Sequence, residues 1–301
     1  MTNQFRSYFF ALLSVICWST VATVFKLALK EMDSAQLLLF SSMTSLLVLF
    51  SILLLKGKLL LIKESQVNQI IYSALLGFLN PFLYYTVLFN AYSLLPAQLA
   101  QPLNYTWGVM LVLMSIPILK QKIRVISILS VLISFIGVVI ISTKGTLLNW
   151  SSFNTAGVIL ALGSSVIWAL YWLFNLKDKR DALIKLFLNF IFGFMFILIY
   201  NLVFGQISLP NVKVLLPAAY VGTFEMGLTF VFWLNALKWS KTTATVSTLI
   251  YISPFISLVF IHYILGEKIL FTSILGLIII IGGIVLQQIT SYKWKKAIKT
   301  V

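Results

Sequence analysis

Long apolar runs separated by short polar connections occupy almost the whole chain. They cover residues 8–29, 35–55, 67–90, 95–118, 124–142, 155–174, 183–204, 213–236, 242–264 and 270–289. A helix needs about 20 apolar residues to cross the hydrocarbon core of a bilayer. The pattern therefore predicts an all-α integral membrane protein with ten transmembrane helices and no separate soluble domain.

Composition supports a lipid environment. Of 301 residues, 60% are hydrophobic and only 10% are charged, and mean hydropathy is +1.03. A soluble protein carries about 25% charged residues. The composition disfavours a soluble enzyme, a disulfide-framed secreted domain and a disordered protein. The first run is longer than the apolar part of a signal peptide and lacks a convincing cleavage site, so we expect it to be retained as a helix.

The basic residues are distributed unevenly between the two sides of the predicted bundle. With the N-terminus inside, 17 of the 22 Lys and Arg residues lie inside and 5 outside. The outer set is Lys26, Lys30, Lys144, Lys213 and Lys268. Cytoplasmic loops of membrane proteins carry the excess of Lys and Arg. The distribution predicts cytoplasmic N- and C-termini in the cell membrane and explains the net charge of +15 without a nucleic-acid partner.

Metal and disulfide chemistry have few candidate ligands. Cys17 is the single cysteine and His262 the single histidine. One cysteine cannot form an intrachain disulfide, and the pair cannot supply a His/Cys zinc cluster. We therefore predict no metal site and no cofactor.

An internal repeat relates the two halves of the sequence. Gly77 and Asn90-Ala91 align with Gly222 and Asn235-Ala236 at an offset of 145, and Trp18 aligns with Trp168 at an offset of 150. After one inserted residue the alignment continues from Ile123–Val139 to Ile269–Val285. A unit of five helices has an odd number of spans, so its second copy must be inverted, as in many transporters. The predicted units are residues 1–145 and 146–292, followed by a basic cytoplasmic tail at 293–301.

Glu225 is the sharpest candidate for function because it lies near the middle of the run 213–236. An ionised carboxylate at the bilayer centre costs about 2.5–3.5 kcal/mol on insertion scales. We expect it to face the bundle interior, as a proton-coupling group or as an anchor for a substrate amine. The alternative is a packing residue hydrogen-bonded to a neighbouring helix. Its repeat mate is Asn80, and one turn later Tyr84 matches Thr229.

Other polar and aromatic residues share faces with these positions. Trp18 and Trp168 are predicted at mid-depth, where an indole N–H needs a partner, and Trp172 follows one turn later. Polar stripes run along 95–118 and 242–264. The candidate substrate-binding residues in these stripes are Gln98, Gln101, Tyr105, Ser247 and Tyr251. Such stripes either connect helices by hydrogen bonds or line a cavity, and matching stripes in matching helices favour the cavity.

Lys26 and the glycines of the end helices have simpler explanations. Lys26 is expected to extend its amine to the outer interface beside Lys30, with a substrate role as the alternative. Four glycines of the end helices are expected to permit close helix packing: Gly137, Gly276, Gly282 and Gly283.

Two stretches resemble EamA-type members of the drug/metabolite transporter superfamily. The first is Trp18-Ser19-Thr20 followed by Phe25-Lys26-Leu27. The second is Pro254-Phe255-Ile256-Ser257, then Leu265-Gly266-Glu267-Lys268, then Gly282-Gly283. The resemblance covers nearly the whole chain. It implies a ten-helix carrier with a central cavity between its halves, movement of amino acids or related metabolites, often outward, and dimer contact through the end helices.

These observations favour a secondary transporter that works by alternating access. Its partners would be the lipid bilayer, a small-molecule substrate and a second copy in a homodimer. The sequence has no GxxxxGK[ST] motif for ATP, so a substrate or proton gradient would supply the energy. A membrane-embedded enzyme and a non-transporting membrane subunit remain as alternatives.

Overall fold

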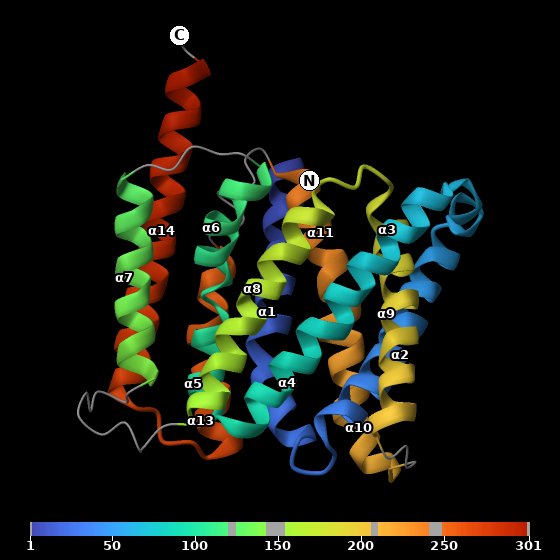
Figure 1. Ribbon diagram of the computed structural model, residues 1–301, viewed down its shortest axis with the longest axis horizontal. Helices are drawn as coiled ribbons and strands as arrows, with labels where there is room; N and C mark the ends of the chain where they lie inside the picture. Colours follow the sequence, from blue (N-terminus) through green and yellow to red (C-terminus); the bar gives the residue numbers. More distant parts are fainter. Residues whose placement is uncertain (1, 120–124, 143–153, 206–209, 241–248, 300–301) are drawn as a thin grey trace.

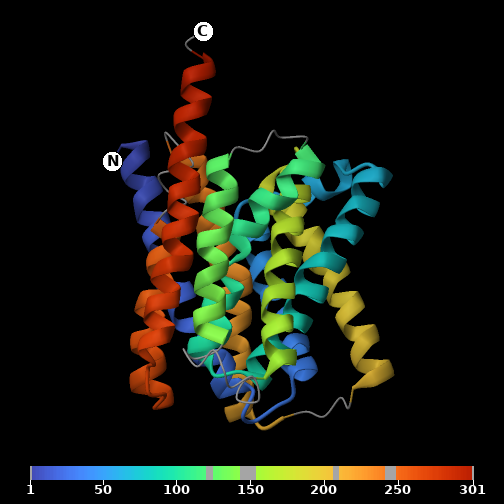
Figure 2. The ribbon, with the colours of Figure 1, turned by 60° about the vertical axis from the view of Figure 1, so that its left-hand side comes forward.

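The computed structural model describes residues 2–119, 125–142, 154–205, 210–240 and 249–299, and these form a bundle of helices (Figures 1 and 2). Six helices are long and apolar enough to cross a membrane. They are Asn3–Ala28 (α1), Ser34–Leu55 (α2), Val67–Leu94 (α3, η2 and α4), Thr155–Asn175 (α8), Ala182–Phe204 (α9) and Val212–Trp239 (α10, η4 and α11). The described chain is therefore a multi-pass membrane bundle.

Shorter helices complete the bundle. They are η1 (Leu59–Glu64), α5 (Ala97–Asn104), α6 (Trp107–Leu119), α7 (Val125–Ser142), η5 (Ile250–Ile252), α13 (Ser253–Leu265) and α14 (Phe271–Lys299). The predicted run 95–118 is thus divided between α5 and α6. The last helix continues through the stretch predicted as a tail, up to Lys299, and projects beyond the bundle (Figure 1).

Two of the long spans are interrupted at matching places. The π-helical segment η2 (Phe78–Leu83) separates α3 (Val67–Gly77) from α4 (Tyr84–Leu94). The π-helical segment η4 (Val221–Leu228) separates α10 (Val212–Tyr220) from α11 (Thr229–Trp239). Asn80 leaves the helical conformation, with φ −151° and ψ 121°, before Pro81. π-Bulges inside helices are frequent at functional sites.

Helix packing is reciprocal between the first and second halves of the chain. In the first half, α1 packs against α11 and α13; in the second, α8 packs against α4 and α6. Likewise α2 contacts η4, and α9 contacts η2. The end helices α7 and α14 pack against each other. The helices of each half are therefore held mainly by helices of the other half.

At several helix crossings, glycines allow the backbones of the two helices to come into close contact. A Cβ at Gly77 would lie 2.3 Å from the carbonyl oxygen of Asn189, and a Cβ at Gly222 would lie 2.2 Å from that of Ser41. Gly137 and Gly276 meet in the same way, since a Cβ at Gly137 would lie 2.6 Å from the Gly276 oxygen. This agrees with the predicted packing role of Gly137 and Gly276. The prediction was wrong for Gly282, where a Cβ would meet no atom of the described chain within 4 Å.

Polar connections fix the end of the bundle that carries the start of α1. Lys58 forms an ion pair with Asp181, which also caps α9. Arg180 binds Asp178 and the hydroxyl of Ser73 on α3. Burial raises the pKa of Asp178, but the hydrogen bonds and charge of Arg180 outweigh this, so the pKa lies below its usual value. The connection between α8 and α9 is thereby attached to α3.

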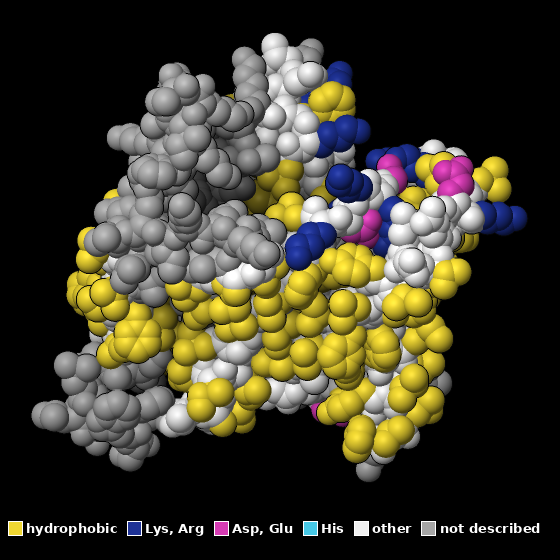
Figure 3. Space-filling view, turned by 45° about the horizontal axis from the view of Figure 1, so that its top comes forward, with side chains coloured by type: hydrophobic (Ala, Val, Ile, Leu, Met, Phe, Trp, Pro, Cys, Tyr) yellow, Lys and Arg dark blue, Asp and Glu magenta, His cyan; other side chains and the backbone are white. Residues whose placement is uncertain are grey.

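The outer surface has an apolar side and a charged end. In Figure 3 hydrophobic side chains cover the side of the bundle, and Lys and Arg side chains gather at its upper end. Large apolar side chains such as Leu55 and Phe204 are mostly exposed. Apolar surface of this extent is typical of contact with lipid or a partner.

Candidate functional site

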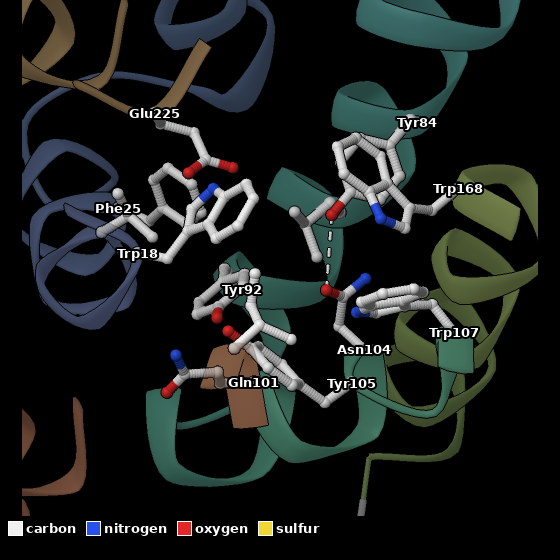
Figure 4. Close-up of a pocket in the computed structure, with 13 residues that line it drawn as sticks. Trp18, Phe25, Tyr84, Tyr92, Gln101, Asn104, Tyr105, Trp107, Trp168 and Glu225 are labelled. Carbon is white, nitrogen blue, oxygen red and sulfur yellow. Dashed lines mark hydrogen bonds between the residues drawn. The ribbon is translucent and has the colours of Figure 1, made fainter. Parts of the chain in front are cut away.

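A central cavity of about 50 Å³ lies where the two halves meet (Figure 4). A buried water needs about 10–15 Å³ measured in this way, so the cavity accommodates several waters or a small chemical group. Its lining residues come from α1, α4, the α5–α6 region, α8, η4 and η5. They are Trp18, Val21, Phe25, Tyr84, Leu88, Tyr92, Gln101, Asn104, Tyr105, Trp107, Trp168, Glu225 and Ile250.

Glu225 supplies the acidic group of this wall. It lies on η4 and is only 5% exposed. The Tyr85 hydroxyl donates a hydrogen bond of 3.0 Å to Oε1, and the Trp18 indole also lies within hydrogen-bonding reach of the carboxyl (Figure 4). Oε2 has no hydrogen-bond partner among the described residues. One carboxyl oxygen is therefore held by the protein, while the other is left for a ligand or a proton.

Aromatic rings form most of the remaining wall. The rings of Tyr84 and Trp168 lie 4.5 Å apart between centroids, and Trp18 makes an edge contact of 5.7 Å with Trp233. A cation within about 6 Å of such a ring face is attracted by its quadrupole. Glu225 is the single charged residue among the lining residues of the described chain. The wall thus favours a ligand with a positively charged group.

Amide groups add hydrogen-bonding capacity. Tyr84 donates to Asn104 Oδ1 at 3.3 Å, and Asn104 Nδ2 donates to Ser164 at 2.8 Å. Gln101 Oε1 is buried without a partner. An amide has both donors and acceptors, so this wall can bind polar atoms of either kind.

Two tyrosines near the cavity lie where helices are interrupted. Tyr105 lies between α5 and α6, and its hydroxyl reaches Ser253 at the start of α13. Tyr251, its repeat mate, lies in η5; its hydroxyl would lie 3.0 Å from a Cβ at Gly108. Each half therefore contributes a tyrosine that reaches the interrupted helix of the other half. Discontinuous helices of this kind form the binding sites of many transporters.

The structure brings together six of the twelve site residues predicted from the sequence. Trp18, Tyr84, Gln101, Tyr105, Trp168 and Glu225 all line the cavity. Trp172 and Tyr251 lie directly behind lining residues, Trp172 against Trp168 and Tyr251 against Trp107. Ser247 lies outside the described residues.

The other three predicted residues have different surroundings. Gln98 binds the backbone of Lys268 and Leu270 and the hydroxyl of Ser273, so it joins α5 to the α13–α14 connection. Thr229 donates to the carbonyl of Phe224, five residues earlier, within the π-helical stretch. Asn80 is fully buried near Tyr171 and is absent from the cavity wall.

Helical spacing accounts for four lining residues that were not predicted from the sequence. Val21 and Phe25 lie three and seven residues after Trp18, and Leu88 and Tyr92 lie four and eight after Tyr84. Residues at these spacings share one helix face. Lys26, by contrast, donates to the backbone oxygens of Tyr92 and Leu95 at 2.7 and 3.0 Å and lies off the wall.

Apolar spans, interlocked halves and a buried acidic cavity define a membrane transporter, and comparison with known proteins identifies the family. The sequence profile of the EamA-like transporter family matches residues 5–143 and 155–287. The chain belongs to this family, which lies in the drug/metabolite transporter superfamily and is a family of transporters rather than of enzymes. Among the described residues no three His, Cys, Asp or Glu side chains lie close enough to hold a metal ion.

Relatives with similar lengths agree with this assignment. An uncharacterized transporter of Clostridium kluyveri is 29% identical over 299 residues, covering 96% of this chain and 94% of the relative. One of Archaeoglobus fulgidus is 26% identical over 285 residues, covering 93% and 96%. The uncharacterized transporter YvbV of Bacillus subtilis is 27% identical over 225 residues, covering 73% and 72%. A crystal structure with a TM-score of 0.65 and 16% identity covers 96% of this chain and 98% of the other, which shows the shared fold.

Proposed function

We propose that this chain is a proton-coupled secondary transporter that exports amino acids or related small metabolites across the cytoplasmic membrane by alternating access. The observation that carries the proposal is the Glu225 carboxyl, buried at the wall of the central cavity with Oε2 free of hydrogen-bond partners among the described residues. Ionisable residues inside a membrane are by default candidates for substrate binding or proton transfer.

The substrate site is formed by the six predicted residues that line the cavity. An amine of the substrate would bind between the Glu225 carboxyl and the rings of Trp18, Tyr84 and Trp168. Gln101 and Tyr105 would receive its polar groups. With no Lys or Arg among the described residues of the wall, this arrangement favours an amine-bearing substrate over a phosphorylated one, because phosphate recognition relies on Arg or Lys.

The architecture supports alternating access. Reciprocal packing, paired π-helical segments and the mates Tyr105 and Tyr251 support two inverted five-helix repeats, 1–145 and 146–292, with ten spans in all. The start of α1 and the end of α14 lie at the same end of the bundle (Figure 1), and the Lys and Arg side chains of Figure 3 gather there. This supports cytoplasmic termini. A homodimer through the end helices is the assembly that the resemblance implies.

Counterflow in proteoliposomes tests the proposal. The native protein and Glu225→Gln are compared with a labelled panel of amino acids, amines and other metabolites. We expect Glu225→Gln to exchange the substrate with a weaker apparent affinity, because the neutral amide keeps hydrogen-bonding groups but loses the charge that binds the amine. Only the native protein should accumulate the substrate against a pH gradient. Glu267→Gln serves as the control, since Glu267 accepts backbone N–H bonds from Ala97 and Gln98 at the start of α5. It should accumulate substrate like the native protein.

Two results would contradict the proposal. Equal pH-driven accumulation by Glu225→Gln and the native protein would make Glu225 a packing residue. Failure of a folded sample to exchange any member of the panel would exclude amino acids and the tested metabolites as substrates.

A further inference from the structure

A second cluster of buried polar side chains lies outside the wall of the central cavity. It contains Asn80 of η2, Tyr171 and Asn175 of α8, and Asn189 of α9, each at most 5% exposed. Asn175 Nδ2 donates to the Tyr171 hydroxyl at 3.2 Å. Asn80 and Asn189 face the same hydroxyl. Three helices therefore direct four polar groups toward one point inside the bundle.

Two of these side chains have polar atoms that the described residues leave without a hydrogen bond. Both amides approach the Tyr171 hydroxyl, but the Nδ2 and Oδ1 atoms of Asn80 and Asn189 make no hydrogen bond of normal geometry with any described residue. Buried polar atoms are nearly always satisfied by protein or by ordered water, and hydrocarbon offers no partner. An occupant must both donate and accept, because each amide presents N–H and C=O groups. Water meets this requirement, whereas a bare cation would leave both Nδ2 groups unsatisfied.

Polar groups continue from the cluster to the end of the bundle that carries the start of α1. The backbone oxygen of Asn175 accepts a hydrogen bond of 3.1 Å from Lys185. Ser73, on the span that carries Asn80, accepts one of 2.6 Å from Arg180 Nη2. Arg180 Nη1 is buried without a partner. This end of the cluster is therefore bounded by groups that bind water readily.

On its other side the cluster adjoins the central cavity. The ring of Tyr171 lies 6.0 Å from that of Trp168, which lines the cavity. Tyr171 also interacts electrostatically with Tyr85, the partner of Glu225. The cluster and the proposed substrate site are therefore joined by the ring contact between Tyr171 and Trp168.

We infer that Asn80, Tyr171 and Asn189 hold internal water, which forms the inner section of an aqueous path between the central cavity and the end of the bundle that carries the start of α1. The inference rests on the proposed transport function, because a path is needed only if the cavity communicates with both sides. It gives Asn80 a role in hydration of the path rather than in substrate binding.

Radiolytic hydroxyl-radical footprinting of the native protein tests whether the cluster is hydrated. Internal water generates radicals next to the side chains that it contacts, so Tyr171 should be oxidised severalfold faster than Phe190. Phe190 is the matched control because it is also buried and follows Asn189 on α9. Oxidation of Tyr171 as slow as that of Phe190 would overturn the inference, whatever the variants below show.

Cysteine accessibility tests whether the water belongs to a path. Asn189→Cys and Asn80→Cys are made in a Cys17→Ser background and exposed to a small charged thiol reagent from each side. Reaction from the side of the α1 start is expected. Ser41→Cys should stay unreactive, since Ser41 is equally buried and its hydroxyl is satisfied by the backbone oxygen of Ala218.

The outcomes separate this inference from the proposed function. Unreactive Asn80→Cys and Asn189→Cys in proteoliposomes that still exchange substrate would overturn the path and leave the transporter intact. Reactive cysteines in a protein without exchange would retain the hydrated path and remove the proposed substrates. If the cysteine variants fail to fold, footprinting of Tyr171 with and without substrate tests the path instead. The hydration of a path must change during transport, so the oxidation rate of Tyr171 should differ between the two conditions. An unchanged oxidation rate would overturn the path.

Discussion

The Tyr85 hydroxyl donates a hydrogen bond to Oε1 of Glu225, from a span of the first half to a span of the second. Both residues follow a π-helical segment or lie within one. The bond therefore fixes the one acidic group of the cavity wall from the opposite half of the chain. Movement of one half against the other must either keep this bond or break it.

Removing that hydroxyl has a measurable cost. Tyr85→Phe leaves Oε1 buried without its partner, and the loss of a hydrogen bond to a charged or buried group costs about 1–3 kcal/mol. We expect a lower unfolding temperature in detergent. Tyr263→Phe is the control, since Tyr263 is 80% exposed. Equal unfolding temperatures for Tyr85→Phe and the native protein would mean that the bond contributes no stability.

The close contact at Gly222 predicts a steric effect. In Gly222→Ala the new methyl group would lie 2.2 Å from the Ser41 oxygen, so α2 and η4 must separate. Overpacking of this kind costs about 1–3 kcal/mol or more. Gly282→Ala is the matched control, because a Cβ there meets no atom within 4 Å. Thermal unfolding should show a loss in the first variant only; equal values would disprove the close contact.

Lys26 is predicted to act on stability and not on substrate affinity. Lys26→Met removes the two hydrogen bonds to Tyr92 and Leu95 at the end of α4. We expect a lower unfolding temperature with an unchanged substrate Kd. Lys30→Met, from the exposed connection after α1, should change neither quantity. A weaker Kd for Lys26→Met at unchanged stability would instead support the substrate role that the sequence left open.

The Asp178–Arg180 pair predicts a dependence of stability on pH. Since the pKa of Asp178 is lowered in the folded protein, the pair stabilises the fold above the pKa of an unfolded aspartate, about 3.9. That stabilisation is lost as the pH falls below this value and the carboxylate takes up a proton. In Asp178→Asn the buried guanidinium loses its counter-ion, which costs about 3–5 kcal/mol at neutral pH.

Melting curves between pH 3 and 7 measure this effect. The difference between Asp178→Asn and the native protein should shrink toward the acidic end. Asp33→Asn is a control, because Asp33 caps α2 without an ion pair at described residues and asparagine also caps well. A difference that stays constant with pH would show that the charge of Asp178 is not the cause.

The apolar runs predicted most helix positions, because a helix needs about 20 apolar residues in succession to cross the hydrocarbon core. The α1 and α9 regions were predicted closely, and the acid at Glu225 was recognised because an ionisable group in a membrane is costly. Periodicity also explains why Phe25 and Tyr92 could have been added to the wall.

The misplaced residues lie where the helical repeat is irregular. The π-helical segment and the extended backbone of Asn80 alter the direction of side chains by more than sequence spacing indicates. Pro81 marks this interruption, but no proline lies within η4. Gln98 could not be placed because its partners, Lys268 and Leu270, lie in a connection 170 and 172 residues away.

Reciprocal packing has a consequence for biosynthesis. When the first half leaves the ribosome, α2 and α3 lack their main partners, since η4 and α9 are still to be synthesised. The helices of the first half must therefore remain loosely associated in the membrane until these partners are inserted. The bundle is completed only as the second half is inserted, because α8 packs against α4 and α6, and α9 packs against α2 and α3.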